Sequence, residues 1–326
     1  MTDMKRVLVT EHMHEAGYDV LAAHKDIEIV RIPDIERETL TAAIKDVHGI
    51  VLRSAKLDID ILQHANSLQI VSRHGVGCDN IDVAHLTDRG IPVAIAAGAN
   101  ARSVAEHTLG FMIAAAREFR ILDDLVKAGR WAERNDYRAK DLKGAKVLIV
   151  GFGRIGRLVA PLCKAFGMDV VVADIALERD LAESMGCRAV EDFRPELAGT
   201  DFLTVHVPLD ETTRHLISKR ELAALTPGAI VINCARGGIV DEDALLAALE
   251  SDHIRAAAVD VMSEEPPRAD HPLIARKDVL MTPHNGAAAM SAAIAMAEVA
   301  AQNVIDLFAG ELKDEMTFNL EGLQKP

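Results

Sequence analysis

A short apolar segment, a glycine-rich turn and a helix-like segment follow one another over residues 146–160. Lys146–Val150 is rich in valine and isoleucine, which is typical of a buried parallel strand. The turn, residues 151–156, reads Gly-Phe-Gly-Arg-Ile-Gly. In this pattern the first glycine allows a tight turn, the second lets backbone approach a pyrophosphate, and the third lets the helix pack close to the strand. N–H groups at the helix start would face the phosphates, so the turn predicts a dinucleotide site.

A second apolar segment, residues 168–173, ends at Asp174. An acidic residue about 20 positions beyond the glycines is where a ribose 2′-hydroxyl needs an acceptor. Glycines also mark ordinary loops, and the alternative is therefore a βαβ unit without a nucleotide. Asp174 favours the dinucleotide. Ile175 follows it and offers no positive charge to a 2′-phosphate, which favours NAD over NADP.

The rest of the chain repeats this alternation of strand-like and helix-like segments, which predicts an α/β fold with parallel sheets. A long helix is predicted over residues 101–128, suited to a spacer between domains, and Trp131 after it is predicted to be a packing anchor. Asp241 is a predicted helix N-cap, and an alanine-rich helix is predicted over 288–308. The other predicted strands are residues 6–10, 27–32, 49–53, 68–72, 92–96, 201–207, 229–234, 254–261 and 279–282.

Composition narrows the class of protein. With 326 residues, 49% of them apolar, the chain can form two domains, and a net charge of −14 argues against a nucleic-acid partner. No apolar run approaches the roughly 20 residues of a membrane span, and the N-terminus has no export signal. His12-x-His14 is interpreted as surface, so no metal site is expected. Reduced thiols and a cytoplasmic location are predicted from four scattered cysteines, Cys78, Cys163, Cys187 and Cys234.

Polar loops follow two of the N-terminal strands, at residues 53–55 and 73–79. Ligands of open parallel sheets bind beyond the carboxyl ends of the strands. Gly75 and Gly77 are therefore candidates to present backbone N–H groups to a small anion. The alternative is a flexible turn before a helix at about Asp82, and ligand contact is the favoured interpretation.

Three further polar side chains, those of Arg236, Glu265 and His284, each follow a predicted strand of the nucleotide-binding part. Histidine is suited to exchange a proton with a substrate oxygen near neutral pH. A carboxylate beside the imidazole would fix its tautomer, and an arginine can hold a substrate carboxylate through two parallel hydrogen bonds. Together they describe interconversion of a 2-hydroxy acid and a 2-keto acid. Singly, they are equally a surface charge, a turn residue and a satisfied loop histidine.

The chain resembles the D-isomer-specific 2-hydroxyacid dehydrogenase family over almost its whole length, with the motifs in family order. The motifs that carry the resemblance are residues 75–82, 100–107, 151–156, 233–238, 260–267 and 282–286. The resemblance implies two Rossmann-like doubly wound parallel-sheet domains with the site in a cleft. An NAD-binding domain, residues 105–288, is inserted into a flavodoxin-like, discontinuous substrate-binding domain, residues 1–104 and 289–326. A homodimer paired through the coenzyme domains is also implied.

The resemblance also implies roles for single residues. Arg236 would bind substrate, Glu265 would partner the histidine, His284 would be the acid/base, and Asp260 would contact the nicotinamide amide. The predicted coenzyme contacts are Gly151, Gly153, Arg154, Ile155, Gly156, Asp174, His206, Val207, Pro208, Thr213, Cys234, Ala235, Arg236, Asp260, His284 and Gly286. The predicted substrate contacts are Ser54, Gly75, Val76, Gly77, Arg236 and His284.

Two positions depart from the family pattern and bear on substrate fit: Cys78 stands where Thr or Tyr is frequent, and Asn285 where Leu or Ile is common. Residues 53–55 and 263–267 favour phosphoglycerate dehydrogenase-like or hydroxypyruvate/glyoxylate reductase-like members, and the chain is expected to lack a serine-sensing extension. Formate dehydrogenase is disfavoured because Glu265, and not glutamine, accompanies the histidine. A different class of protein with this fold, an NAD(H)-sensing corepressor, is the alternative.

Overall fold

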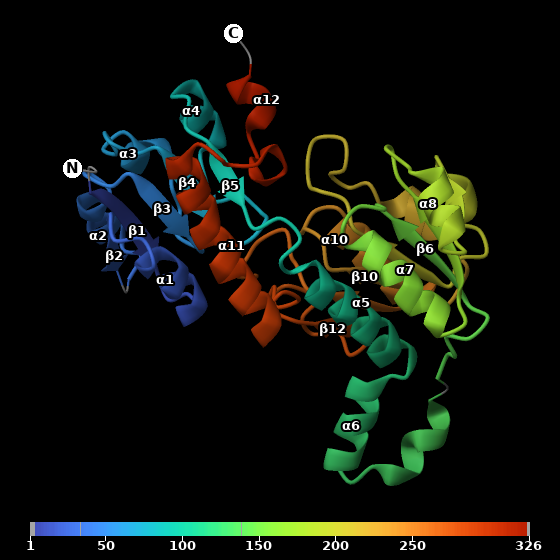
Figure 1. Ribbon diagram of the computed structural model, residues 1–326. Coiled ribbons are helices and arrows are strands. Elements are labelled where there is room, and N and C mark those ends of the chain that lie inside the picture. Colours follow the sequence, from blue (N-terminus) through green and yellow to red (C-terminus); the bar gives the residue numbers. More distant parts are fainter. Residues whose placement is uncertain (1–3, 33, 138, 325–326) are drawn as a thin grey trace. The chain divides into compact units, whose positions relative to one another are not determined.

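The computed structural model describes residues 4–32, 34–137 and 139–324. Internal contacts divide the chain into two units: unit 1 is Met1–Asn100 with Ala288–Pro326, and unit 2 is Ala101–Ala287. Each unit is built around one parallel sheet with helices on its faces (Figure 1). The predicted α/β class with two doubly wound sheets is therefore confirmed.

Unit 1 has a five-stranded parallel sheet in the order β2-β1-β3-β4-β5, the flavodoxin-like arrangement. Its strands are β1 Lys5–Thr10, β2 Ile27–Ile32, β3 Gly49–Leu52, β4 Ile70–Arg73 and β5 Val93–Ile95. Its helices are α1 Glu15–Ala22, α2 Arg37–Ala43, α3 Ile59–Leu62, α4 Val83–Asp88, α11 Met290–Ala309, η3 Asp314–Met316 and α12 Leu320–Leu323.

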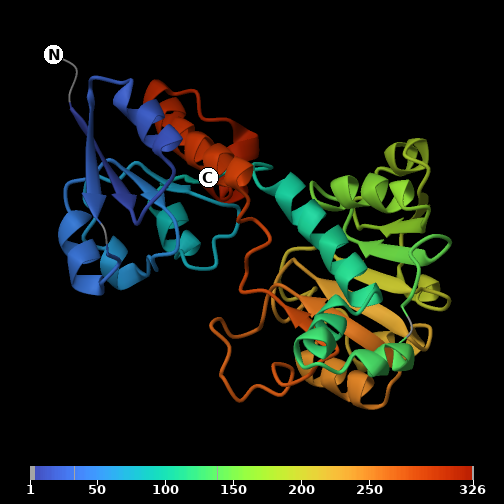
Figure 2. The same cartoon turned by 90° about the horizontal axis from the view of Figure 1, so that it is seen from below.

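Helix α11 joins the C-terminal part of the chain to the N-terminal sheet. It packs beside α1 (Figure 2). Its residues Ala297, Ala301 and Val304 share a core with Val7 and Val9 of β1. At 20 residues α11 is long and apolar enough to cross a membrane, so the expectation that no segment reaches that length is wrong. Burial of its alanine-rich face in the core explains its apolar composition, since a core helix meets the same criterion.

Unit 2 has a seven-stranded parallel sheet in the order β12-β11-β10-β9-β6-β7-β8. Numbered from β6, this is the 3-2-1-4-5-6 Rossmann order with one added strand, and the order reverses between β6 and β9. Its strands are β6 Lys146–Val150, β7 Asp169–Ala173, β8 Arg188–Val190, β9 Phe202–Val205, β10 Ala229–Asn233, β11 Ile254–Val259 and β12 Val279–Met281. Its helices are α5 Ala101–Ala116, α6 Phe119–Lys127, η1 Trp131–Asp136, α7 Gly156–Ala165, α8 Arg179–Ser184, η2 Arg194–Glu196, α9 Lys219–Ala224 and α10 Glu242–Glu250.

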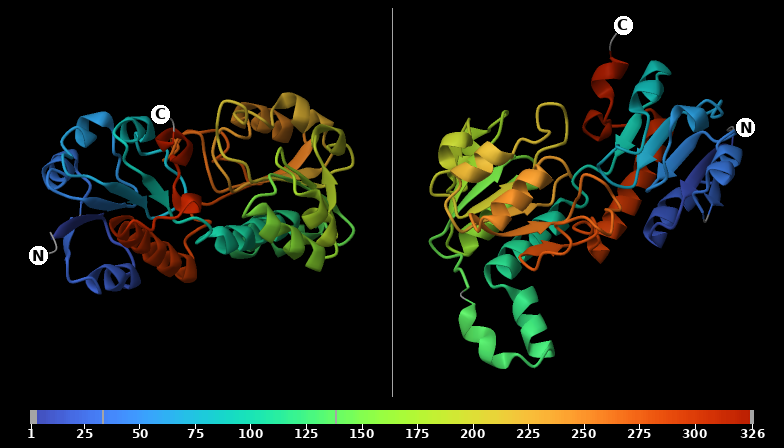
Figure 3. Two further views of the ribbon diagram at one scale, coloured as in Figure 1. Left: turned by 45° about the horizontal axis from the view of Figure 1, so that its top comes forward. Right: turned by 180° about the vertical axis from the view of Figure 1, so that it is seen from behind.

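The alternation of side chains along β6 builds the two cores of unit 2. Val147 and Ile149 face the helices α5 and α7 on one side of the sheet. Leu148 and Val150 face α9 and α10 on the other (Figure 3). A strand that is apolar on both faces is what the sequence of this segment predicts for a fully covered parallel sheet. Asp241 caps α10 as predicted, because its carboxylate accepts the N–H of Ala244 at 3.1 Å.

The predicted single helix over residues 101–128 is wrong in its continuity. The helix breaks between α5 and α6, where Glu118 adopts a left-handed conformation with φ 54° and Arg255 holds its carboxylate at 2.5 Å. The segment α6–η1 then projects from unit 2 as an arm (Figures 1 and 3). Trp131 lies on this arm with 62% of its surface exposed, so it is not a packing anchor within its own chain.

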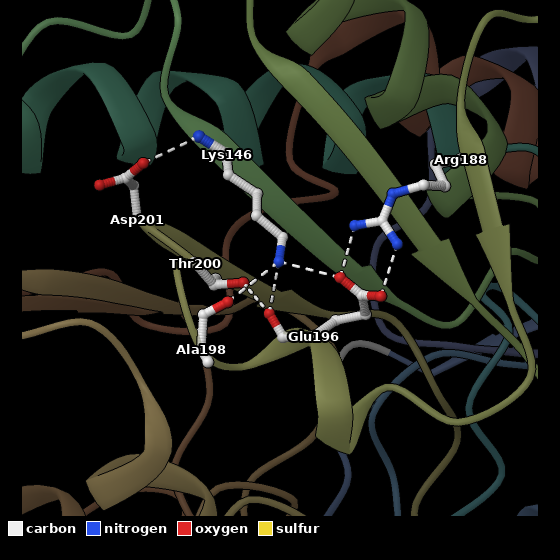
Figure 4. A network of polar contacts seen from close by, with 6 residues as sticks. All are labelled: Lys146, Arg188, Glu196, Ala198, Thr200 and Asp201. Carbon is white, nitrogen blue, oxygen red and sulfur yellow. Dashed lines mark hydrogen bonds and ion pairs between the residues drawn. The ribbon is translucent and has the colours of Figure 1, made fainter.

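The start of β6 is fixed by a network of charges (Figure 4). The Lys146 ammonium bonds the Glu196 carboxylate at 2.9 Å and the Ala198 carbonyl at 3.2 Å. Arg188 forms two parallel bonds, each 2.5 Å, to the same carboxylate. The Lys146 N–H donates to Asp201 at 2.9 Å, which ties β6 to the start of β9. This network stands at the opposite end of β6 from the glycine-rich turn.

Candidate active site

The three glycines after β6 have three different surroundings. Gly151 has φ 100°, and a Cβ added there would lie 2.6 Å from the His206 carbonyl. A Cβ on Gly156 would lie 2.1 Å from the Gly151 oxygen, so only glycine lets α7 start so close to the strand. A Cβ on Gly153 would have no atom of the described chain within 4 Å. Gly153 thus leaves open space where backbone can approach a pyrophosphate, and the residues present fit a dinucleotide.

Asp174, at the end of β7, is bound to the same turn. One carboxylate oxygen accepts the N–H of Phe152 at 2.6 Å, and the other accepts the N–H of Ala176 at 2.8 Å. Arg154 and Ile155 lie on the turn between the second and third glycines. The acid is therefore held beside the first turn of the glycine-rich segment, where an acceptor for a ribose hydroxyl belongs.

The loop after β9 lines the other side of the point where the strand order reverses. Burial lowers the pKa of His206 to about 4, so its imidazole is neutral at pH 7. Its Nε2 lies 3.0 Å from the Thr204 hydroxyl, while its Nδ1 is buried with no hydrogen-bond partner in the described part of the chain. Thr213 closes the loop by donating to the Pro208 carbonyl at 2.6 Å. The backbone carbonyl of His206 lies against Gly151, so this residue with its orphaned polar atom belongs to the same strand-end region, which suits a site that takes a polar ligand.

Arg236, Glu265 and His284 follow the carboxyl ends of β10, β11 and β12, which are neighbours in the sheet. His284 and Glu265 are in contact, with 2.8 Å between Nδ1 and Oε2. The other oxygen of Glu265 accepts the N–H of Met262 at 3.0 Å, so the carboxylate is itself oriented. With Nδ1 bound to the carboxylate, Nε2 is the nitrogen that remains to exchange a proton with a substrate.

Arg236 stands on a tightly folded loop. Asn233 shapes it from the end of β10, since its side chain accepts the N–H of Ala235 at 3.0 Å and donates to the Arg236 carbonyl at 2.8 Å. A Cβ on Gly237 would lie 2.0 Å from the Met262 carbonyl, so this loop packs directly on the segment that leads to Glu265. Burial raises the pKa of Cys234 to about 12, which keeps this thiol protonated. One Nη of the Arg236 guanidinium donates to the Ala235 carbonyl at 2.8 Å.

Asp260 organises the loop that carries His284. Its carboxylate is 3% exposed and accepts the Thr282 hydroxyl at 2.5 Å, the Asn285 N–H at 2.7 Å and the Gly286 N–H at 2.8 Å. The Asp260 carbonyl accepts the His284 N–H at 2.7 Å, with His284 at φ 50°. The role predicted for Asp260, contact with the nicotinamide amide, stays a prediction.

One further residue belongs to this cluster, although its sequence context does not mark it as a site residue. His107 of α5 lies 3.0 Å from the Thr282 hydroxyl and 3.7 Å from Asp260. It is the last residue of the motif at residues 100–107. The imidazole within a family motif is the signal in the sequence that points to it.

The predicted substrate loops belong to unit 1 and are shaped by two residues that the sequence analysis did not single out. Glu11, with φ 60°, accepts the N–H of Ser54 at 2.6 Å. Arg73 donates to the Gly77 carbonyl at 2.8 Å and to the His74 carbonyl at 2.9 Å. The Gly75 N–H donates to Arg73, so this N–H is already bonded within the loop rather than directed at an anion. Val76 and Cys78 lie on the same loop.

Known proteins with similar sequences include NAD-binding dehydrogenases, in agreement with the dinucleotide site described above. The family model described as D-isomer specific 2-hydroxyacid dehydrogenase, NAD binding domain, matches residues 109–286. The D-3-phosphoglycerate dehydrogenase of Methanocaldococcus jannaschii is 39% identical over 96% of this chain and 59% of its own length. That of Bacillus subtilis is 38% identical over 99% of this chain and 60% of its own length. The chain thus spans about three fifths of these relatives.

Two solved structures share the fold over nearly the whole chain. An NADPH-dependent glyoxylate/hydroxypyruvate reductase from Sinorhizobium meliloti, in complex with NADP and malonate, has a TM-score of 0.84 and 28% identity, covering 97% of this chain and 98% of its own. The D-lactate dehydrogenase of Aquifex aeolicus, with NAD and lactic acid, has a TM-score of 0.83 and 25% identity, covering 94% and 96%.

Proposed function

We propose an NAD-dependent oxidoreductase activity on D-2-hydroxy acids for this chain, which belongs to the D-isomer-specific 2-hydroxyacid dehydrogenase family and contains its NAD-binding domain. The observation that carries the proposal is the His284–Glu265 pair beyond β12 and β11, in the same unit as the glycine-rich turn. Residues 151, 153–156, 174, 206–208, 213, 234–236, 260, 284 and 286 are proposed to hold the coenzyme. Hydride transfer is the chemistry that a bound nicotinamide supplies.

His284 is proposed as the acid/base. In the reductive direction its Nε2 donates a proton to the substrate oxygen, and in the oxidative direction the same atom accepts it. The Glu265 carboxylate, 2.8 Å from Nδ1, fixes the tautomer and stabilises the imidazolium that forms when the proton is held. The arrangement is thus suited to proton exchange in both directions.

Arg236 is proposed to bind the substrate carboxylate and polarise the adjacent carbonyl, because a guanidinium offers two parallel donors to one carboxylate. Unit 1 is proposed as the substrate-binding domain, with Ser54, Gly75, Val76 and Gly77 contributing. The two loops that hold these residues are braced by Glu11 and Arg73, which supports a shaped site rather than flexible turns.

The substrate is proposed to be 3-phosphoglycerate, or hydroxypyruvate and glyoxylate in reduction. The test is NADH oxidation with glyoxylate, hydroxypyruvate, pyruvate, phenylpyruvate and 2-oxoglutarate, together with NAD reduction by 3-phosphoglycerate. We expect turnover of at least one of the proposed substrates and none without a keto or hydroxy acid. Binding of NADH with no turnover across the panel would contradict the proposed activity.

A homodimer formed through the arm is proposed as the functional assembly. Three large apolar side chains of the arm are exposed: Phe119 at 54%, Val126 at 56% and Trp131 at 62%. Apolar side chains gathered on a projecting segment are typical of a surface that another chain covers. A cytoplasmic location is proposed as well, supported by four buried free cysteines, because a reducing compartment preserves thiols.

A further inference from the structure

Two charged side chains meet on the backbone of Phe152, the residue between the first two glycines of the turn. The Phe152 N–H donates to the Asp174 carboxylate at 2.6 Å. The Phe152 carbonyl accepts from Nε of Arg157 at 2.9 Å. A guanidinium therefore lies on the same residue as the acid that marks the adenosine ribose of a dinucleotide.

This guanidinium is already engaged by a second acid. Glu178 follows Asp174 on the loop between β7 and α8, and its Oε1 lies 2.6 Å from Nη2 of Arg157. The pair is accessible to solvent, with 35% of the Arg157 side chain and 59% of the Glu178 side chain exposed. The next cation along the chain, Arg179 at the start of α8, is directed elsewhere, to the Ala189 carbonyl at 3.0 Å.

The charges at this edge decide which coenzyme fits. Asp174 and Glu178 bring two negative charges and Arg157 one positive charge, so these three side chains together are net negative; Arg154, on the exposed part of the turn, stands outside this group. The 2′-phosphate of NADP adds about −1.5 to −2 near neutral pH and would meet this net negative charge. A guanidinium is well suited to hold a phosphate through two parallel bonds. The Arg157 guanidinium instead donates to the Phe152 carbonyl and the Glu178 carboxylate, both of which belong to this chain.

We propose that Glu178 is a second determinant of coenzyme choice: by pairing with Arg157 it withholds from a 2′-phosphate the guanidinium that is bonded to the same residue, Phe152, as Asp174. Asp174 alone accounts for binding of the ribose hydroxyl. Glu178 has a different effect: it keeps the neighbouring Arg157 guanidinium from binding the 2′-phosphate of NADP. The inference rests on the proposed coenzyme use and is independent of the substrate.

The test measures dissociation constants of NADH and NADPH by nicotinamide fluorescence, without any substrate. The variants are Asp174→Ser, Glu178→Gln and the two combined. We expect Asp174→Ser alone to weaken the binding of NADH and to improve the binding of NADPH only slightly. Adding Glu178→Gln should tighten the binding of NADPH further, by on the order of tenfold, because Arg157 can then form a charge-assisted bond to the phosphate. Adding Arg157→Ala to the double variant should cancel this gain.

Glu183→Gln is the matched control, because Glu183 is 57% exposed and pairs with Arg179 instead, at 3.7 Å. Each substitution is added to Asp174→Ser. An equal gain in NADPH affinity from Glu183→Gln and from Glu178→Gln would show an effect of overall charge and overturn the inference. A complete switch to NADPH by Asp174→Ser alone would overturn it too. These titrations need no turnover, so a wrong substrate assignment leaves them unchanged. A wild-type chain that binds neither dinucleotide would overturn both this inference and the proposed function.

Discussion

Gly286 donates its backbone N–H to the Asp260 carboxylate at 2.8 Å, and a methyl group on Gly286 would lie 2.9 Å from the same oxygen. Glycine at this position therefore lets the loop that carries His284 close onto a buried acid. The same carboxylate takes the N–H of Asn285 and the hydroxyl of Thr282. The placement of His284 thus depends on contacts made two residues away along the chain.

Gly286→Ala is expected to lower kcat by about tenfold or more, because a shift of the catalytic loop by a fraction of an ångström misplaces the imidazole. Steady-state kinetics with the preferred substrate measure the effect. Gly110→Ala in α5 is the control, since a Cβ there would have no described atom within 4 Å. Equal kinetics of the two variants would contradict the proposed positioning.

The glycine-rich turn separates a glycine needed for folding from one needed for binding. Gly156→Ala would place Cβ 2.1 Å from the Gly151 oxygen and should lower the free energy of unfolding, seen as a lower urea midpoint. In Gly153→Ala the added Cβ would lie in open space, so the variant should fold normally. Its affinity for NADH should nevertheless fall by about tenfold or more, because the Cβ occupies the position proposed for the pyrophosphate. Unchanged NADH affinity of Gly153→Ala would contradict this coenzyme placement.

His284→Ala should reduce kcat by about a hundredfold to ten-thousandfold, the usual contribution of a positioned acid/base, with NADH affinity nearly intact. Glu265→Gln should reduce kcat less, because an amide keeps an acceptor at 2.8 Å from the ring but loses the charge that stabilises the imidazolium. Arg236→Ala should raise KM and lower kcat together. Near-normal turnover of His284→Ala would show that the acid/base is another group.

Glu196 links stability to pH. The Arg188 bonds, assisted by Lys146, lower the pKa of this carboxyl from 4.5 to about 2. Its contribution to stability is therefore present above pH 4.5 and is lost as the pH falls towards 2. Glu196→Gln should cost about 1 to 2 kcal/mol at pH 7, allowing for screening by solvent, and much less at pH 2. Urea unfolding at both pH values measures this, with the 88% exposed Glu191→Gln as the control. A loss that is the same at both pH values would exclude the ionised form as its origin.

The arm predicts the behaviour of the chain in solution. Light scattering should give the mass of two chains for the wild type and of one chain for the variant Phe119→Glu/Trp131→Glu, because buried charge opposes association. Phe166→Glu, at a 45% exposed position at the end of α7, should leave the mass at two chains. A wild-type mass of one chain at micromolar concentration would contradict the homodimer.

Local patterns predicted the fold well because each strand carries its own signal. Lys146–Val150 and its glycines identify a parallel strand and turn without reference to distant residues, and a strand that is apolar on both faces indicates a sheet covered by helices on both sides. The break at Glu118 was not predictable, because the partner of that carboxylate, Arg255, is 137 residues away. Trp131 was misjudged for a related reason: an isolated tryptophan does not reveal whether its own chain covers it.

The candidate site was predicted in part. His284 and Glu265 were paired correctly, since both follow neighbouring strands and complementary chemistry links them. Their supports were not predicted. His107 approaches Asp260 from a helix more than 150 residues earlier in the chain, and nothing in its local sequence specifies that contact. Long-range contacts of this kind are fixed by packing rather than by local pattern.

The Lys146–Glu196–Arg188 network and the glycine-rich turn occupy opposite ends of one strand. At the start of β6 the charged network supplies rigidity and involves none of the proposed coenzyme contacts. At the end of β6 the glycines must lack side chains so that the backbone can approach the coenzyme. Substitutions that strengthen or weaken the network can therefore tune the temperature range of the chain without altering its affinity for the coenzyme. We therefore expect stability and coenzyme affinity to respond to different sets of substitutions at the two ends of β6.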